Sequence, residues 1–539
     1  MFWEKCGKER LERGYYARLS QAISRLEKTD MSSLSQAYCA MASKDRELIR
    51  RGGRAIRLVM EPMTMRQVIQ LSEKFRQYTS LEWEIDWRSL DIREKRDWFQ
   101  SKEDYYWVLA LGSFHPNGYY RQVCLEEMTD YPGALPFLVL RLNDWVEQVR
   151  LAAARAVSDR LEMCSLNEVF MAMTALDKVR CSGRKDHRTV ERIGKSIGER
   201  LDAEAGALSV PSILGMDYDM RKSVYRFLFG GRRLDLETAE NLLDRERHSF
   251  CQSIIWTGLL THYQCPMEMI DRYLVHRSSC IRRKALEYKY HVIGCAWPGA
   301  ENLLLDANHG IRDLAAYIMR KHSRMDILAF YKDHLKGPDL VTAILGIGEQ
   351  GGDQEVTGLV LPFLEHESEK VVRSALESLG MLLGAEGEGI YWKYLLDTRP
   401  CVSKAAYMCL RKNGVHPGAG MLYEEQDKWR ESKGTAAAAG AQSADATGPY
   451  TIFHVRRYLI LLLLQENSWD RLPYLIYLLK DASLEEYRDK LLGALRFRSL
   501  YARVDRKQAA FIKQVLAEEA DTVPQELAGD ILFDLKFVS

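Results

Sequence analysis

The sequence has little proline, no excess of charge and no long apolar run, and each absence excludes a class of protein. Only 14 of the 539 residues are proline, and few segments alternate between apolar and polar residues, which favours helices over strands. Lys and Arg number 76 against 75 Asp and Glu, giving a formal net charge of +1. The chain therefore lacks the basic excess that is typical of proteins that bind nucleic acid or anionic membranes.

Membrane spans and disulfide frameworks are equally unsupported. The longest dense apolar run, Tyr458–Leu464, is far shorter than the ~20 residues that a spanning helix needs. The charged N-terminus lacks the apolar segment of a signal peptide. Eleven scattered cysteines fit reduced thiols better than paired ones. We expect a soluble cytoplasmic protein with no membrane span and no cofactor.

A short pattern recurs through the middle of the chain, in which an apolar residue is followed by a basic or polar one. It is found, at intervals of 30 or 31 residues, at Met220-Arg221, Cys251-Gln252, Ile281-Arg282, Ile311-Arg312, Val341-Thr342, Val372-Arg373 and Val402-Ser403. Another apolar residue follows the second member after one helical turn, and an apolar stretch with helical spacing precedes each pair. Each unit is therefore predicted to be two helices joined by a tight turn. Because two short helices cannot bury their apolar faces alone, the units must stack, which predicts an all-α solenoid.

Two segments carry a family resemblance. LPFLVLRLNDWVEQVRLAAARAV (135–157) and LVLPFLEHESEKVVRSALESLGMLL (359–383) resemble HEAT repeats of the short, PBS-lyase type. That family has an acidic residue in the turn and Val-Arg at the start of the second helix. Asp144 with Arg150, Asp306 with Arg312, and Glu367 with Arg373 match this pattern, whereas Gln252, Thr342 and Ser403 depart from the arginine. The resemblance covers about 120–412 clearly and 453–536 weakly, and it implies an armadillo-like α-α superhelix.

Four regions are predicted along the chain. Residues 1–115 form a helical cap, whose aromatic residues between Tyr78 and Trp107 cover the first apolar face of the array. Residues 116–412 form the repeats. Residues 413–450, which include the low-complexity run KGTAAAAGAQSADATGP (433–449), form a linker, and 451–539 form C-terminal helical repeats or a cap. An exposed basic loop is expected at 182–186.

The arginines of the repeat predict a structural ladder between neighbouring units. Because an acidic residue recurs with the arginine, each guanidinium is expected to bridge turn carboxylates and carbonyls of adjacent repeats. The predicted ladder comprises Asp144, Arg150, Arg221, Arg282, Asp306, Arg312 and Arg373. The alternative is a row of cations that tracks phosphates.

No catalytic motif is present. The sequence contains no G-x-x-x-x-G-K-[ST], G-x-S-x-G or H-E-x-x-H, so no catalytic residue is assigned and a non-enzymatic protein is favoured. One enzyme family offers an alternative. Asp144-Trp145 and Arg150 are superficially similar to residues on the concave face of HEAT-like DNA glycosylases, which would bind nucleic acid in the same groove. The charge balance argues against this alternative.

The favoured function is a protein interaction scaffold that uses the concave face of the solenoid. The residues five positions after the second member of each pair mix basic, acidic, polar and apolar side chains, which favours protein recognition. This mixed row comprises Arg226, Thr257, Glu287, Tyr317, Ile347, Ser378 and Met408. Basic and aromatic residues gather on two adjacent second helices. The predicted partner surface, which would bind an acidic segment of another protein, comprises Arg283, Tyr290, Tyr317, Arg320 and Lys321.

Four His/Cys pairs lie in one window, and their spacing predicts that they do not form a zinc site. They are His248/Cys251, His262/Cys265, His276/Cys280 and His291/Cys295. The pairs recur at half the repeat length, so successive pairs fall at opposite helix ends. Pairs at the same end lie on helices ~8–10 Å apart, too far for convergence on one ion. We expect purified protein to hold no stoichiometric zinc; elemental analysis giving about one ion per chain would contradict this.

Overall fold

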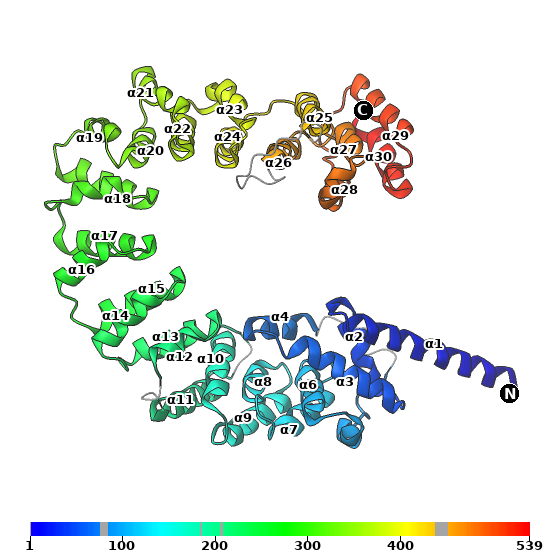
Figure 1. Cartoon of the computed structure of the whole chain (residues 1–539). Coiled ribbons are helices and arrows are strands. Elements are labelled where there is room, and N and C mark those ends of the chain that lie inside the picture. The colour runs from blue at the N-terminus through cyan, green and yellow to red at the C-terminus, as the bar shows by residue number, and fades with distance from the viewer. Residues whose placement is uncertain (1, 76–84, 184–185, 205–207, 437–450) are drawn as a thin grey trace. The chain divides into compact units, whose positions relative to one another are not determined.

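The computed structural model describes residues 2–75, 85–183, 186–204, 208–436 and 451–539. Within these ranges every regular element is a helix and no strand forms (Figure 1). Successive helices pack as pairs in chain order, so the predicted fold class, an all-α solenoid, is confirmed. The chain divides into two compact units, 1–289 and 290–539. The boundaries predicted at 115 and 412 do not coincide with this division.

The first unit begins with helices that do not follow the repeat. These are α1 (Phe2–Leu26), α2 (Leu34–Tyr38), α3 (Arg46–Met60), α4 (Met65–Phe75) and α6 (Lys102–Gly112). Trp87 is buried against Tyr38 and His115, with ring centroids 5.9 and 4.3 Å apart. Helix α6 packs between α3 and the first repeat helix, α7 (Gly118–Met128). Of the aromatic residues predicted to cover the array, Tyr78 and Trp83 lie outside the described residues.

The repeat helices of the first unit follow α7 in order. They are α8 (Leu135–Leu140), α9 (Glu147–Leu161), α10 (Leu166–Arg180), α11 (His187–Glu204), α12 (Val210–Leu214), α13 (Tyr218–Gly230), α14 (Leu236–Arg245), α15 (Ser249–His262), α16 (Met267–Leu274) and α17 (Ser279–Ile293). Helix α17 runs past the boundary into the second unit. The expected basic loop at 182–186 is described only in part, because 184–185 lie outside the described residues.

The second unit continues the pattern. It contains the 3-10 helix η6 (Ala300–Leu305), α18 (His309–His322), α19 (Ile327–Asp333), α20 (Leu340–Gln350), α21 (Gln354–Val360), α22 (Glu369–Leu382), α23 (Glu388–Leu395), α24 (Pro400–Lys412), α25 (Ala419–Ala436), α26 (Thr451–Leu463), α27 (Leu472–Leu478), α28 (Arg488–Arg496), α29 (Arg506–Glu518) and α30 (Gln525–Val538). The second helices α20, α22, α24 and α26 pack on one another in that order.

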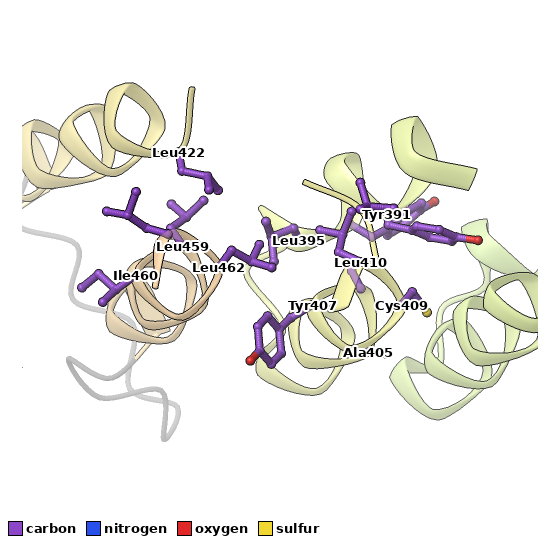
Figure 2. Close-up of a cluster of buried hydrophobic side chains, with 14 of the residues drawn as sticks. Tyr391, Leu395, Ala405, Tyr407, Cys409, Leu410, Leu422, Leu459, Ile460 and Leu462 are labelled. Carbon is purple, nitrogen blue, oxygen red and sulfur yellow. The ribbon is translucent and has the colours of Figure 1, made fainter. Parts of the chain in front are cut away.

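The linker predicted at 413–450 is wrong for part of its length, because 419–436 form helix α25. Figure 2 shows why: Leu422 points into a cluster that includes Leu459 and Ile460 of α26. Leu422 is 1% exposed, and the ring of Tyr423 lies 5.3 Å from that of Tyr474. Burial of these side chains holds the helix against α26 and α27. Residues 437–450 lie outside the described residues.

The helical register of the repeat places its apolar residues in the core. Of the residues three positions after each second member, Val224, Ile255, Ala285, Ala315, Leu376 and Ala406 are buried. Leu345 is only half-buried, and it lines a groove on this face of the unit. The mixed row predicted to face a partner is wrong at Ile347 and Ser378, whose side chains are fully buried.

Close packing of α20 on α22 explains that correction. A Cβ atom placed on Gly348 would lie 2.6 Å from Cα of Ser378, so glycine is needed for the two helices to approach this closely. Gly358 in α21 is the opposite case, because nothing lies within 4 Å of a Cβ at that position.

Gly348→Ala is expected to lower the free energy of unfolding by about 1–3 kcal/mol, because an overpacked contact forces backbone shifts. The matched control, Gly358→Ala, should raise it by about 0.5–1 kcal/mol, since alanine loses less entropy in a helix. Urea denaturation followed by circular dichroism measures both. Equal effects of the two substitutions would contradict the close approach of α20 and α22.

Candidate functional site

The arginine of the repeat closes the turn between the two helices. Its guanidinium Nη1 donates to the carbonyl oxygen six residues earlier, where the turn begins. Arg121, Arg150, Arg282 and Arg312 donate in this way to His115, Asp144, His276 and Asp306 over 2.7–2.8 Å. The side-chain amide of Gln252 makes the same bond to Glu246, at 2.8 Å. These side chains satisfy a carbonyl group that no helix would pair.

A second set of bonds joins neighbouring repeats. Nη2 of Arg121 donates to Oδ1 of Asp144 over 2.7 Å, and both side chains are fully buried. Nε of Arg221 donates in the same way to Glu246 over 3.0 Å. The third pair, Arg456 with Asp481, is separated by 2.5 Å. In each pair the acid follows the arginine by 23 or 25 residues and lies in the next turn.

Two of these arginines were not predicted from the sequence. Arg121 precedes the first recognised pattern residue, Arg150, by 29 residues, and Tyr120 supplies the apolar residue before it. Val455-Arg456 follows the same rule beyond the predicted linker. A search for an apolar residue followed by arginine at the repeat interval, without requiring an acidic residue in the same turn, would have found both.

Arg373 does not belong to the ladder, which corrects the prediction. Its Nε donates to Glu377 of its own helix over 2.9 Å, and its side chain is 55% exposed. The physical reason is a nearer partner: Glu377 lies one turn further along α22, and the guanidinium pairs with this exposed carboxylate.

A groove of about 680 Å³ lies on the second-helix face of the second unit, across α18, α20, α22 and α24. One end holds the ion pair of Arg312 and Glu349, in which Nε of Arg312 donates to Oε2 over 2.9 Å. Nδ1 of His309 lies 2.9 Å from Oε1 of the same glutamate. The apolar lining includes Leu345 and Met381, and the latter is 47% exposed.

The groove offers contacts rather than a reactive group. Cys409 lines it, but burial raises the pKa of its thiol to about 12, so the sulfur stays protonated near neutral pH. Its thiol donates to the carbonyl oxygen of Leu376 over 3.3 Å. Both acidic residues of the lining are already paired, Glu349 with Arg312 and Glu377 with Arg373.

Three of the five predicted partner-binding residues, Tyr290, Tyr317 and Lys321, meet where α17 ends beside α18, and Arg320 precedes Lys321 on α18. The rings of Tyr290 and Tyr317 are 6.2 Å apart, edge to face. The hydroxyl of Tyr290 lies 3.0 Å from Nε2 of His322. Lys321 donates to the hydroxyl of Tyr317 over 3.3 Å. We call Tyr290, Tyr317, Arg320, Lys321 and His322 the tyrosine–cation cluster.

The fifth predicted residue, Arg283, belongs to the first unit. It lies on α17 seven residues before Tyr290, and its Nε donates to Glu287 over 2.9 Å. That pair is within one helix and exposed on both sides. The charge of Arg283 is therefore balanced on its own helix.

The two cations of the cluster have no acidic partner. Arg320 donates to Oε1 of Gln350 over 2.9 Å, and the Lys321 ammonium lies 5.5 Å from the centre of the Tyr317 ring. Within the described ranges, no carboxylate pairs with either side chain. Hydrogen bonds to Tyr317 and Tyr290 raise the pKa of Lys321, so it is charged at neutral pH. The cluster thus presents positive charge that the chain does not neutralise.

Asp144, Trp145 and Arg150, the residues of the glycosylase alternative, lie together at one turn. The Asp144 side chain is fully buried and accepts a hydrogen bond from Arg121, while the neighbouring Trp145 is 61% exposed. Arg150 donates to the carbonyl oxygens of both residues, at 2.8 and 3.2 Å. The three residues form a turn instead of a pocket.

The His/Cys window shows ordinary helix contacts. Burial raises the pKa of Cys251 to about 11, and the thiol of Cys265 donates to the carbonyl of Leu259 over 3.6 Å. In the part of the chain that the structure describes, no three His, Cys, Asp or Glu side chains come together as metal ligands would. The helices of those same residues include none that is long and apolar enough to cross a bilayer.

No protein-family model and no curated protein matches this chain. Among solved structures, one from a study of the phosphorylation switch that controls the interaction between cadherin and beta-catenin matches 93% of this chain and 99% of its own, with 14% identity and a TM-score of 0.22. A likeness at this level says nothing about what this chain binds.

Arg312→Ala is expected to lower the free energy of unfolding by about 3 kcal/mol, because it leaves Glu349 buried without its guanidinium and the Asp306 carbonyl without a donor. Arg373→Ala is the matched control, and it should change stability by less than about 0.5 kcal/mol, because that arginine is exposed. Chemical denaturation of both variants measures the difference. Similar losses would mean that Arg312 does not hold the turn.

Proposed function

We propose that this chain is a HEAT-like interaction scaffold whose tyrosine–cation cluster binds an acidic segment of a partner protein. The observation that carries the proposal is a pair of adjacent cations on α18 that no carboxylate neutralises: Lys321 lies beside Tyr317 and Tyr290, and Arg320 donates to the amide oxygen of Gln350. Two cations that were buried, or paired with carboxylates of the same chain, would not attract an acidic partner. Here a partner's carboxylates would supply the missing acceptors.

The cluster is organised before a partner arrives. Tyr290 contacts Tyr317 edge to face and lies within hydrogen-bond distance of His322, so its ring is held from two sides. Lys321 is held over Tyr317. Side chains that are already ordered lose less conformational entropy on binding. Tyrosine and arginine also bury a large surface area in an interface while keeping a polar group that can form a hydrogen bond.

The groove extends the surface along the same helices. Arg312 donates to Glu349 and Arg320 donates to Gln350, so the groove and the cluster meet at the C-terminal end of α20. Eight residues separate Arg312 and Arg320 on α18, a rise of ~12 Å. An extended segment of about four residues spans that distance. We expect acidic residues of the partner over the cluster, and apolar ones over Leu345 and Met381.

The test is a charge reversal, Arg320→Glu with Lys321→Glu, compared with Lys336→Glu and Lys370→Glu. The control changes net charge equally, at two exposed lysines of the same unit that lie outside the groove lining. Fluorescence anisotropy with a labelled poly-glutamate peptide should show binding to the wild type and the control, and at least ~10-fold weaker binding to the cluster variant. Melting temperatures should not differ.

Equal peptide binding by the cluster and control variants would contradict the proposal. A duplex DNA oligonucleotide provides the comparison between classes of ligand, since nucleic acid is the alternative occupant of this face. If the duplex binds more tightly than the peptide and is lost in the same variant, the surface binds nucleic acid instead of protein.

A further inference from the structure

A pocket of about 540 Å³ lies at the turn edge of the first unit, and it shares no residue with the tyrosine–cation cluster. It is lined by Leu214, Arg221, Arg245, Glu246, Arg247 and Arg277. These residues come from the ends of α12 and α14, from α13, and from the two turns that precede α15 and α17. Four of the six lining residues are therefore arginines, and one is an acid.

The single acid is already fully engaged. Oε2 of Glu246 accepts from Nε of Arg221 over 3.0 Å and from the hydroxyl of Tyr225 over 2.9 Å. Oε1 accepts from the backbone nitrogens of Arg247 and His248, each at 2.8 Å. The Glu246 side chain is 2% exposed. It therefore balances Arg221 and has no capacity left for the other arginines.

The other three arginines are exposed around the pocket. Nη2 of Arg277 donates to the backbone carbonyl of Asp244, which fixes that side chain beside the opening. The Asp244 carboxylate lies 3.6 Å from Nε2 of His276. Among the residues that the structure describes, none forms a hydrogen bond or ion pair with the guanidinium group of Arg245 or of Arg247. Two guanidinium groups thus line one pocket without a protein acceptor.

We propose that this pocket binds a phosphate group carried on a phosphorylated serine or threonine side chain. Planar guanidinium forks match the oxygens of a phosphate dianion, and several arginines together are the usual way to hold one. No lining residue is aromatic, so the pocket offers no ring on which a nucleotide base would stack. Its volume exceeds what a bare phosphate needs, which leaves room for the side chain that carries it. The proposal does not depend on the function assigned to the second unit.

The experiment is isothermal titration of the full chain with N-acetyl-phosphoserine amide and, separately, with inorganic phosphate, at constant ionic strength. The test variant is Arg245→Gln with Arg247→Gln. Its matched control is Arg50→Gln with Arg283→Gln, which removes two exposed arginines that pair within their own helices. The wild type and the control should bind the phosphoserine derivative. The test variant should bind it at least ~10-fold more weakly.

The unfolding temperature of the test variant should equal that of the wild type, because neither arginine has a protein partner to lose. Unchanged phosphoserine binding by that variant would overturn the proposal, as would an absence of binding by the wild type. Inorganic phosphate that binds as tightly as the phosphoserine derivative would overturn the assignment to a carried phosphate.

Discussion

The solenoid depends on how its tight turns satisfy the carbonyl group with which the turn begins. Two helices joined by a few residues leave that oxygen without a helical partner, and in a stacked array it is shut away from water. A long side chain at the fourth residue of the second helix donates to it, as Arg150 and Arg312 do. The same guanidinium still has donors to spare, and Arg121 and Arg221 use them to reach the acid of the next turn. One side chain therefore closes a repeat and fixes its neighbour.

Much of this could be predicted from the sequence, because helical periodicity and a regular spacing report on burial and on helix starts. Ala285 and Ala406 lie in the core where their spacing placed them, and the all-α fold followed from the same pattern. The register of individual helices was not predictable. Arg373 is exposed and pairs with Glu377 of its own helix, and the packing of Gly348 on Ser378 buries a position that periodicity placed outside. Such packing depends on contacts between helices, which no local pattern records.

The candidate sites differ in how far the sequence could define them. Tyr290, Tyr317 and Lys321 were predicted as a surface stripe, and the structure adds that Lys321 has two tyrosines and no acid beside it. Arg283 was grouped with them by spacing alone, but Glu287 balances its charge. The arginine pocket of the first unit was not predicted, because its residues come from separate turns that only the fold brings together.

The bonds between repeats also limit how such a chain can change its length. Three arginines pair with an acid at a set distance along the chain, 23 residues for Arg121 and 25 for Arg221 and Arg456. Removal of one helix pair would also remove the acid that neutralises the preceding arginine. That guanidinium would stay buried without a partner, so the loss of stability would exceed the loss of the removed helices' own contacts. Insertions should cost little stability only where they fall outside those intervals. The array is therefore expected to grow or shrink by whole blocks that carry both an arginine and the next acid.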